Sequence, residues 1–228
     1  MKRTRMILLA AACLVAATTT LGQMLGVNPF RKPNIVDIFR PVVGSGAVYE
    51  TQRSGPEGEK GQMEMNVVGR EAVDGKDGYW LEMGMTDKKT GQMAYGKMLV
   101  TKDDFQFHRM IWQQPGQPAM EFPVNFTGTN THMKEELEKW HEVGSETITV
   151  PAGTFSCHHW KKDQGVGDVW ASDKISPMGM VKSVNSYDTM VLVKIVTGAT
   201  DHITGPVTKF DPEALKKQMM ERTQKQKP

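Results

Sequence analysis

The chain has 228 residues, of which 39% are hydrophobic and 7% aromatic, and it carries 28 basic and 26 acidic side chains. This length favours one domain with short additional segments, and the apolar content is sufficient for a hydrophobic core. The near-neutral charge, without a basic stripe, argues against a nucleic-acid partner. Methionine occurs 17 times, so we expect it to do packing that Leu and Phe usually do.

The first 22 residues have the pattern of a secretory signal peptide. Lys2, Arg3 and Arg5 precede the apolar run 6–17, and small residues follow up to Gly22. This run is shorter than the roughly 20 residues that span a bilayer. We therefore expect cleavage near Gly22 and a periplasmic or secreted protein. The mature chain would contain 25 basic and 26 acidic side chains.

The chain has two cysteines, Cys13 and Cys157. Cys13 could be an acylated lipoprotein cysteine, although Ala10 stands where a leucine is expected, and this alternative stays open. If Cys13 leaves with the signal peptide, Cys157 has no partner for an intramolecular disulfide. Its thiol is then either buried and inert, or a ligand or reactive group.

Residues 23–45 contain Pro29, Pro33 and Pro41 and are interpreted as an extended N-terminal arm. Residues 46–205 then form the main domain, where short β-prone runs are separated by turns of Gly, Asp, Lys or Pro. The spacers are too short for helical crossovers, so the sheet should be antiparallel. The expected strands are 47–52, 62–71, 78–86, 92–101, 105–112, 119–124, 147–150, 154–160, 168–171, 180–182 and 188–197.

Alternation along these strands assigns side chains to faces, because neighbouring residues point to opposite sides. Residues 63, 65 and 67 are apolar and alternate with polar ones, and residues 79, 81, 83 and 85 form a similar row that is opposed by Glu82. We expect Glu64 and Glu82 to lie on the outer, solvated face. The opposite face should be covered or should line a cavity.

Two helices are expected beside the sheet. Met133, Leu137 and Trp140 lie at helical spacing within 131–140, which predicts a short amphipathic mid-chain helix. Asp211 followed by Pro212 is typical of a helix start, so residues 206–228 should contain a C-terminal helix and a polar tail. The predicted fold is mainly β, a curved antiparallel half-barrel or clam with these two helices.

Two motifs resemble a known class of secreted proteins. The run T-V-P-A-G-T-F at 149–155 and the pattern W-x-S-x-x-x-x-P-x-G-x-V-K at 170–182 are similar to those of secreted bacterial β-clam proteins. These proteins are related to the LolA/LolB-like lipoprotein carriers and to periplasmic families of unknown function. The resemblance covers roughly 46–200. It implies a curved sheet around an apolar cavity that receives lipoprotein acyl chains, although no lipoprotein-binding residue can be matched to a position here.

The leading hypothesis is non-catalytic binding of a lipid or acyl chain in a half-barrel cavity. Thioethers are flexible and polarizable, so methionine rows suit variable apolar ligands; the simpler alternative is that these methionines are core residues. The candidate cavity residues share an apolar side chain and a predicted inward position. They are Met63, Met65, Leu81, Met83, Met85, Phe107, Trp140 and Met190.

Two alternatives remain. Thioethers also select soft metals such as Cu(I), and Cys157, His159, Met178 and Met180 could bind copper or silver. The third hypothesis is an envelope scaffold that binds another protein. G-x-S-x-G, H-E-x-x-H and P-loop patterns are missing from the sequence, and we expect neither catalysis nor a cofactor.

Overall fold

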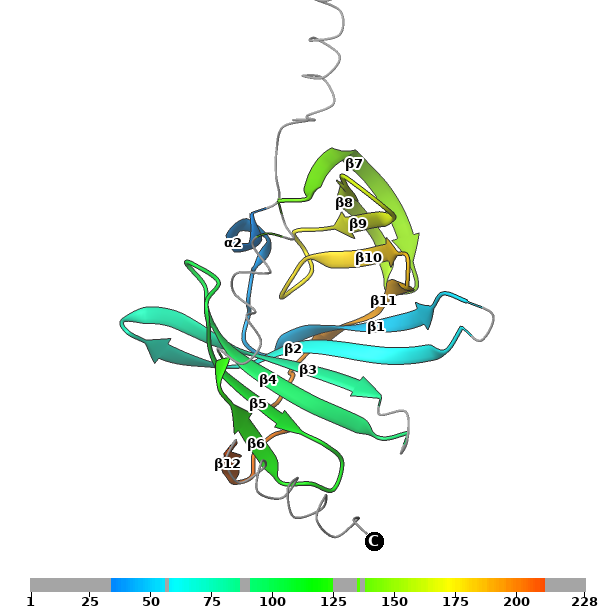
Figure 1. The fold of residues 1–228 in the computed structure, drawn as a ribbon. Coiled ribbons are helices and arrows are strands. Elements are labelled where there is room, and N and C mark those ends of the chain that lie inside the picture. Colours follow the sequence, from blue (N-terminus) through cyan, green and yellow to red (C-terminus); the bar gives the residue numbers. More distant parts are fainter. Residues whose placement is uncertain (1–33, 56–57, 87–90, 125–134, 136–137, 212–228) are drawn as a thin grey trace, which may run out of the picture.

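The computed structural model describes residues 34–55, 58–86, 91–124, 135 and 138–211 (Figure 1). These residues form one open, curved sheet of 12 strands and a short helix, α2, at Ile35–Ile38. The predicted signal peptide, most of the mid-chain helix and the C-terminal helix from 212 onward lie outside the described residues. No helix within the described ranges is long and apolar enough to cross a membrane.

The strands fall into two groups along the chain. The first group comprises β1 (Ser45–Arg53), β2 (Lys60–Val73), β3 (Lys76–Thr86), β4 (Met93–Thr101), β5 (Phe107–Gln113) and β6 (Ala119–Phe122). The second comprises β7 (Trp140–Val150), β8 (Gly153–Lys162), β9 (Gly167–Ala171), β10 (Met180–Asn185), β11 (Asp188–Thr197) and β12 (Val207–Lys209).

Strands β1–β6 and strands β7–β11 each form an antiparallel meander, and the two meanders join along one seam. Strand β1 pairs with β11, from Ser45 opposite Thr197 to Arg53 opposite Asp188, so the continuous sheet places β6 near one end and β7 at the other. The final strand, β12, pairs in parallel with β6. The predicted antiparallel arrangement is therefore confirmed for every strand pair in the described sheet except this last one.

The predicted strands are all present, but the structure corrects the chain around the expected helices. Trp140 was expected in the mid-chain helix, yet it opens β7 and pairs with Lys162. Strand β7 consequently starts seven residues before the predicted strand at Thr147. At the C-terminal side, Val207–Lys209 forms a strand within the segment 206–228, ahead of the helix that was expected from Pro212.

The inner face of the first meander is the side that packs on Phe39. Phe39, 1% exposed, follows α2 directly and belongs to a buried cluster with Val67, Leu81 and Val100. Its ring meets the Phe105 ring edge to face at 5.0 Å. Helix α2 lies above the first meander and beside strands β8 and β9 (Figure 1).

The connection between β9 and β10 completes this core. In this connection Ile175 and Pro177 are fully buried. Ile175 packs with Tyr49 and Leu192, while Met178 packs against the cluster of Phe39. The loop therefore links the cores of the two meanders.

The outer face of β3–β5 is covered by a segment that we call the strap, residues 198–206, between β11 and β12. Ile203 of the strap packs with Ile111 and Ala119. Glu82, expected on a solvated face, is 0% exposed beneath it. The expectation was wrong for Glu82, because a distant part of the chain covers a face that is polar by its own sequence pattern.

Candidate functional site

The inner face of β2–β6 is unusually rich in methionine. Directly paired residues of neighbouring strands share a face, and the register makes two transverse rows. One row runs Met65, Met83, Gly96, Trp112, Met120; the next runs Val67, Leu81, Met98, Met110, Phe122. A third pair, Met63 and Met85, lies beside them. We call the seven methionines of this surface the methionine face: Met63, Met65, Met83, Met85, Met98, Met110 and Met120.

A pocket of about 270 Å³ opens on the methionine face. Ordinary small-molecule pockets measure roughly 300–1,000 Å³, so it would accommodate a slender ligand. Its lining side chains are mainly thioethers and aromatic rings, and the residues are Met83, Gly96, Lys97, Met98, Met110, Ile111, Trp112 and Phe122. Lys97 is the charged member, and its ammonium is engaged by Asp201 and by the Ile203 carbonyl at 2.8 Å.

Gly96 allows an aromatic ring to lie on the floor of this pocket. A Cβ atom at this position would be 2.3 Å from Cε3 of Trp112, which is far inside van der Waals contact. Glycine therefore lets the Trp112 indole lie directly on β4. The ring broadens the apolar surface between the methionines on either side.

The eight predicted cavity residues are distributed over several parts of the fold. Met83 lines the pocket. Met63, Met65 and Met190 pack against the cluster of Tyr49, and Leu81 and Phe107 are buried in the cluster of Phe39. Met85 is 44% exposed. Trp140 lies on the edge strand β7, far along the sheet from the methionine face.

Alternation alone did not reveal four pocket residues, Met98, Met110, Trp112 and Phe122. Met98 follows Gly96 at a spacing of two, which was an available signal, but the glycine interrupts the apolar row. Between Leu99 and Val100 of β4 the register with β5 shifts, so that Met110 is opposite Met98 whereas Phe107 is opposite Val100. That irregularity depends on pairing with β4 and has no local sequence pattern.

Cys157 and His159 lie on one side of β8, as their spacing predicts, but their surroundings differ. Cys157 is 1% exposed within the core, and burial, with a smaller contribution from Glu146, raises the pKa of its thiol to about 11. His159 stacks on Trp170. Its Nδ1 is 3.0 Å from Glu146 and its Nε2 is 2.7 Å from Asp168, so carboxylates engage both ring nitrogens.

The other members of the soft-metal hypothesis are not gathered around these two. Met180 packs against the cluster that contains Cys157, whereas Met178 packs against the cluster of Phe39. Within the described residues, no three His, Cys, Asp or Glu side chains form a group that could hold a metal ion. The structure thus separates the two methionines that the sequence places two residues apart.

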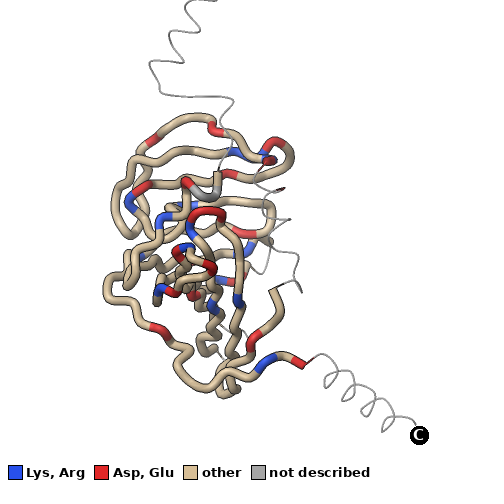
Figure 2. The backbone as a smooth tube through the Cα atoms, turned by 90° about the vertical axis from the view of Figure 1, so that its left-hand side faces the viewer, with Lys and Arg blue, Asp and Glu red and all other residues tan. Residues whose placement is uncertain are grey.

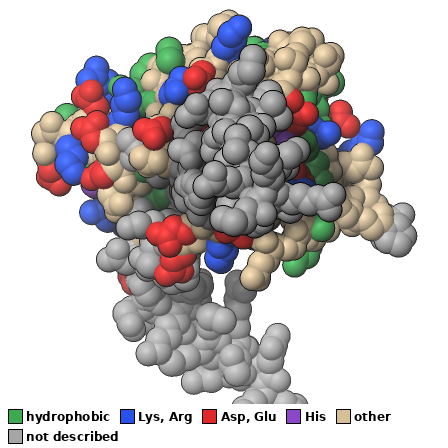
Figure 3. All heavy atoms as spheres, turned by 90° about the horizontal axis from the view of Figure 1, so that it is seen from above, with side chains coloured by type: hydrophobic (Ala, Val, Ile, Leu, Met, Phe, Trp, Pro, Cys, Tyr) green, Lys and Arg blue, Asp and Glu red, His purple; other side chains and the backbone are tan. Residues whose placement is uncertain are grey.

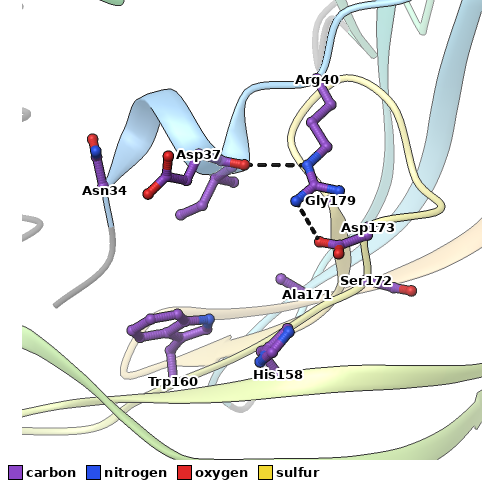
Figure 4. A pocket seen from close by; sticks show the side chains of 10 residues that line it. Asn34, Asp37, Arg40, His158, Trp160, Ala171, Ser172, Asp173 and Gly179 are labelled. Atoms are coloured by element: carbon purple, nitrogen blue, oxygen red, sulfur yellow. Dashed lines mark hydrogen bonds and ion pairs between the residues drawn. The ribbon is translucent and has the colours of Figure 1, made fainter. Parts of the chain in front are cut away.

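A second, smaller pocket of about 70 Å³ lies between α2 and strands β8 and β9 (Figure 4). Arg40 bridges to Asp173 at 3.0 Å above it. On its floor, Nδ1 of His158 is 2.6 Å from Glu142, which is 2% exposed. The volume corresponds to about two water molecules, which is too small for an organic ligand.

The strap takes part in a polar network on the outer face. Glu82 accepts a hydrogen bond from the His202 backbone at 3.0 Å and lies 2.6 Å from His202 Nδ1. Burial raises the pKa of Glu82, and the contacts with His202 oppose this rise in part. Tyr95 stacks on His202 at 4.2 Å, and burial together with Glu64 raises the Tyr95 pKa to about 12. These contacts fix the strap to the sheet.

Charged residues of both signs are interspersed along the described backbone (Figure 2). The same mixture is visible among the coloured side chains at the periphery of the molecule viewed from above (Figure 3).

Comparison with known proteins gives two structural likenesses. No protein-family model and no curated protein match the sequence. A protein from Bacteroides fragilis NCTC 9343, described as exported and as having a YmcC-like fold, aligns with 69% of this chain and 98% of its own, at 12% identity and a TM-score of 0.37. A protein from Parabacteroides distasonis ATCC 8503, described as a lipoprotein, aligns over 69% and 97%, at 14% identity and a TM-score of 0.36. These values assign neither a family nor a function to the chain.

Proposed function

We propose that the protein is a non-catalytic binder of an apolar ligand, a lipid or acyl chain, in the periplasm or another extracytoplasmic compartment. The observation that carries this proposal is the pocket of about 270 Å³ on the methionine face. The predicted secretory signal supplies the compartment. The resemblance to carriers of lipoproteins supplies the acyl chain as the expected ligand.

The partial exposure of the methionines supports a binding role in addition to their packing against the core clusters. The described residues include eleven methionines, and none of them is fully buried. The buried core instead consists mainly of Val, Leu, Ile, Phe, Tyr and Ala side chains, such as Val67, Leu99 and Tyr49. Flexible thioethers on a half-exposed surface can adapt to ligands of different shape, and contiguous apolar surface of this kind is common at binding sites.

The chemistry of the pocket favours the chain of a lipid over its headgroup. Methionine and aromatic side chains offer dispersion contacts without fixed direction. Lys97 is the charged lining residue, but its ammonium is used by the strap. We therefore expect affinity to increase with chain length and to depend little on headgroup charge.

The first experiment is native mass spectrometry of the protein purified from its own envelope, without detergent or chelator. We expect additional mass that dissociates as a lipid. A copper-sized or silver-sized adduct would favour the soft-metal hypothesis instead. A bare polypeptide that also fails to bind the apolar dye N-phenyl-1-naphthylamine would contradict lipid binding and leave the scaffold hypothesis ahead.

A matched pair of variants locates the site. Met98 and Met93 both lie on β4, but Met98 faces the pocket and Met93 faces the opposite side. Met98→Ser should weaken dye binding about tenfold, since it removes roughly 1.4 kcal/mol or more of apolar contact. Met93→Ser should leave the affinity unchanged. Equal effects of the two changes, with comparable thermal midpoints, would show that the dye binds elsewhere.

A further inference from the structure

The protein contains two kinds of sulfur in different environments. Cys157, in the core of the second meander, is 1% exposed, and its raised pKa keeps the thiol protonated at neutral pH. A protonated, buried thiol reacts slowly with oxidants. Met83, Met98 and Met110 are only partly buried around one pocket. Their thioethers are therefore more accessible to a small oxidant than the Cys157 thiol.

We infer that the methionine face is a site of reversible oxidation, and that its conversion to methionine sulfoxide releases the apolar ligand. This inference rests on the proposed function, since it describes the regulation of the same pocket. It adds a modification site, a class of reagent and a direction of control.

The reagent is a peroxide. The methionine sulfur donates a lone pair to one peroxide oxygen, a sulfur–oxygen bond forms and the oxygen–oxygen bond breaks. Hydrogen peroxide leaves as water, or an alkyl hydroperoxide as its alcohol, and the sulfur is oxidised by two electrons. Methionine sulfoxide reductases reverse the change with a dithiol as reductant.

The pocket would respond strongly to this change because its lining is apolar. A sulfoxide is polar and chiral, and it disrupts methionine-rich contact surfaces. Burying its oxygen under an acyl chain without a hydrogen-bond donor is unfavourable. Lys97, the charged lining residue, already donates to the Ile203 carbonyl and contacts Asp201. Met98 and Met110 are a directly paired couple on adjacent strands, so the two oxidised side chains would lie side by side in the pocket.

The test begins with graded hydrogen peroxide and peptide mapping of the purified protein by mass spectrometry. We expect oxygen to be added at Met83, Met98 and Met110 before any oxidation of Cys157. Earlier oxidation of Cys157, or resistance of all three methionines while the protein stays folded, would overturn the modification site. This measurement does not depend on ligand binding.

The second measurement is the affinity for N-phenyl-1-naphthylamine before and after oxidation. We expect at least a tenfold loss, equivalent to about 1.4 kcal/mol, and recovery after treatment with methionine sulfoxide reductases. If the untreated protein does not bind the dye, the proposed function itself fails. If it binds equally well when oxidised, only the regulatory inference is overturned.

Variants connect the loss to particular sulfur atoms. In a protein with Met83→Leu, Met98→Leu and Met110→Leu, the ratio of affinities before and after peroxide should be close to one, whatever its starting affinity. Met93→Leu, on the other side of β4, should keep the tenfold ratio. A ratio that stays at ten in the triple variant would overturn the assignment, and the single Met98→Leu change provides the same comparison if the triple variant does not fold.

Discussion

Two glutamates on the outer face of the first meander have opposite electrostatic environments. Glu82 is buried under the strap, and burial raises its pKa. Glu121 forms a bidentate pair with Arg109, at 2.7 and 3.1 Å. The hydrogen bonds from Arg109 lower the pKa of Glu121. The two glutamates should therefore make opposite contributions to the pH dependence of the folding equilibrium.

At the residue scale we predict how each glutamate affects stability. A raised folded-state pKa stabilises the fold at acidic pH, and this stabilisation is lost as the pH rises from about 4.3, the unfolded value, through the folded value. Glu82→Gln should therefore reduce the fall in unfolding free energy between pH 4.5 and 7.5. Urea unfolding at the two pH values measures this change. The prediction would be contradicted if the unfolding free energy of the variant fell with pH as much as that of the unmodified protein.

Glu121→Gln provides the comparison of opposite sign. A lowered folded-state pKa contributes stability above about pH 4.3, and this contribution is lost as the pH falls through the folded value. We expect the variant to lose roughly 1 kcal/mol at pH 7 because it weakens charge-assisted hydrogen bonds to Arg109. The difference from the unmodified protein should shrink below pH 4 in the same urea experiment.

At the scale of elements, the strap is held by an ion pair that is largely removed from solvent. The side chains of Lys97 and Asp201 are 10% and 31% exposed. Asp201→Asn keeps an acceptor for the Ile203 amide, now 2.8 Å from Asp201, but leaves the Lys97 charge without its partner. We predict that the variant loses roughly 1–3 kcal/mol of unfolding free energy. Its hydrogen exchange should accelerate, relative to the unmodified protein, more in the strap than in β4.

A surface ion pair on the same meander is the control for this prediction. Arg70 and Asp77 pair with side chains that are 57% and 50% exposed. Such exposed pairs contribute little to stability because solvent screens them, so Asp77→Asn should change stability little and leave exchange in the strap unaltered. Similar losses in the two variants would show that the strap does not depend on its buried pair.

At the scale of the whole molecule, the seam between β1 and β11 makes the two meanders one folding unit. Tyr49 of β1 is 0% exposed and packs with Leu192 of β11. Its hydroxyl donates to the Met180 carbonyl at 3.1 Å. We predict that Tyr49→Ala costs about 3–5 kcal/mol and lowers the unfolding midpoint of both meanders together. Hydrogen exchange resolved by peptide measures each meander separately.

Tyr49→Phe is the conservative companion of this change. It keeps the packed ring and removes only the hydrogen bond to the Met180 carbonyl, for an expected loss of about 1 kcal/mol. If Tyr49→Ala destabilised only β1–β6 and left β7–β11 protected, the meanders would be independent units. The seam would then be an interface between them.

Much of the sheet could be predicted from the sequence because alternation is a local property. Apolar residues at spacing two placed Met63, Met65, Met83 and Met85 on one face, and the register agrees. The burial of Glu82 could not be predicted, since the strap that covers it lies 120 residues further along the chain. The sequence around Ile203 has no apolar repeat that would indicate a covering segment.

The candidate site was predicted only in part, for a related reason. Met83 was recognised on its own strand, but the pocket also needs Met110 and Phe122, which meet it through the pairing of β3 to β6. Cross-strand register is a property of several segments together. Met178 and Met180 show the converse: they are close in sequence, but the loop that carries Met178 turns it into a different cluster.

The seam also determines the order in which the fold can be completed. Ser45 pairs with Thr197, so the pairing of β1 with β11 joins segments from nearly opposite ends of the sheet-forming chain. It can form only after most of that chain has been brought together. Contacts this distant in sequence slow folding, typically into the millisecond-to-second range for β proteins. Until β11 docks, β1 presents an unpaired edge that other chains can extend. The chain is therefore most prone to aggregation before its last long strand is in place.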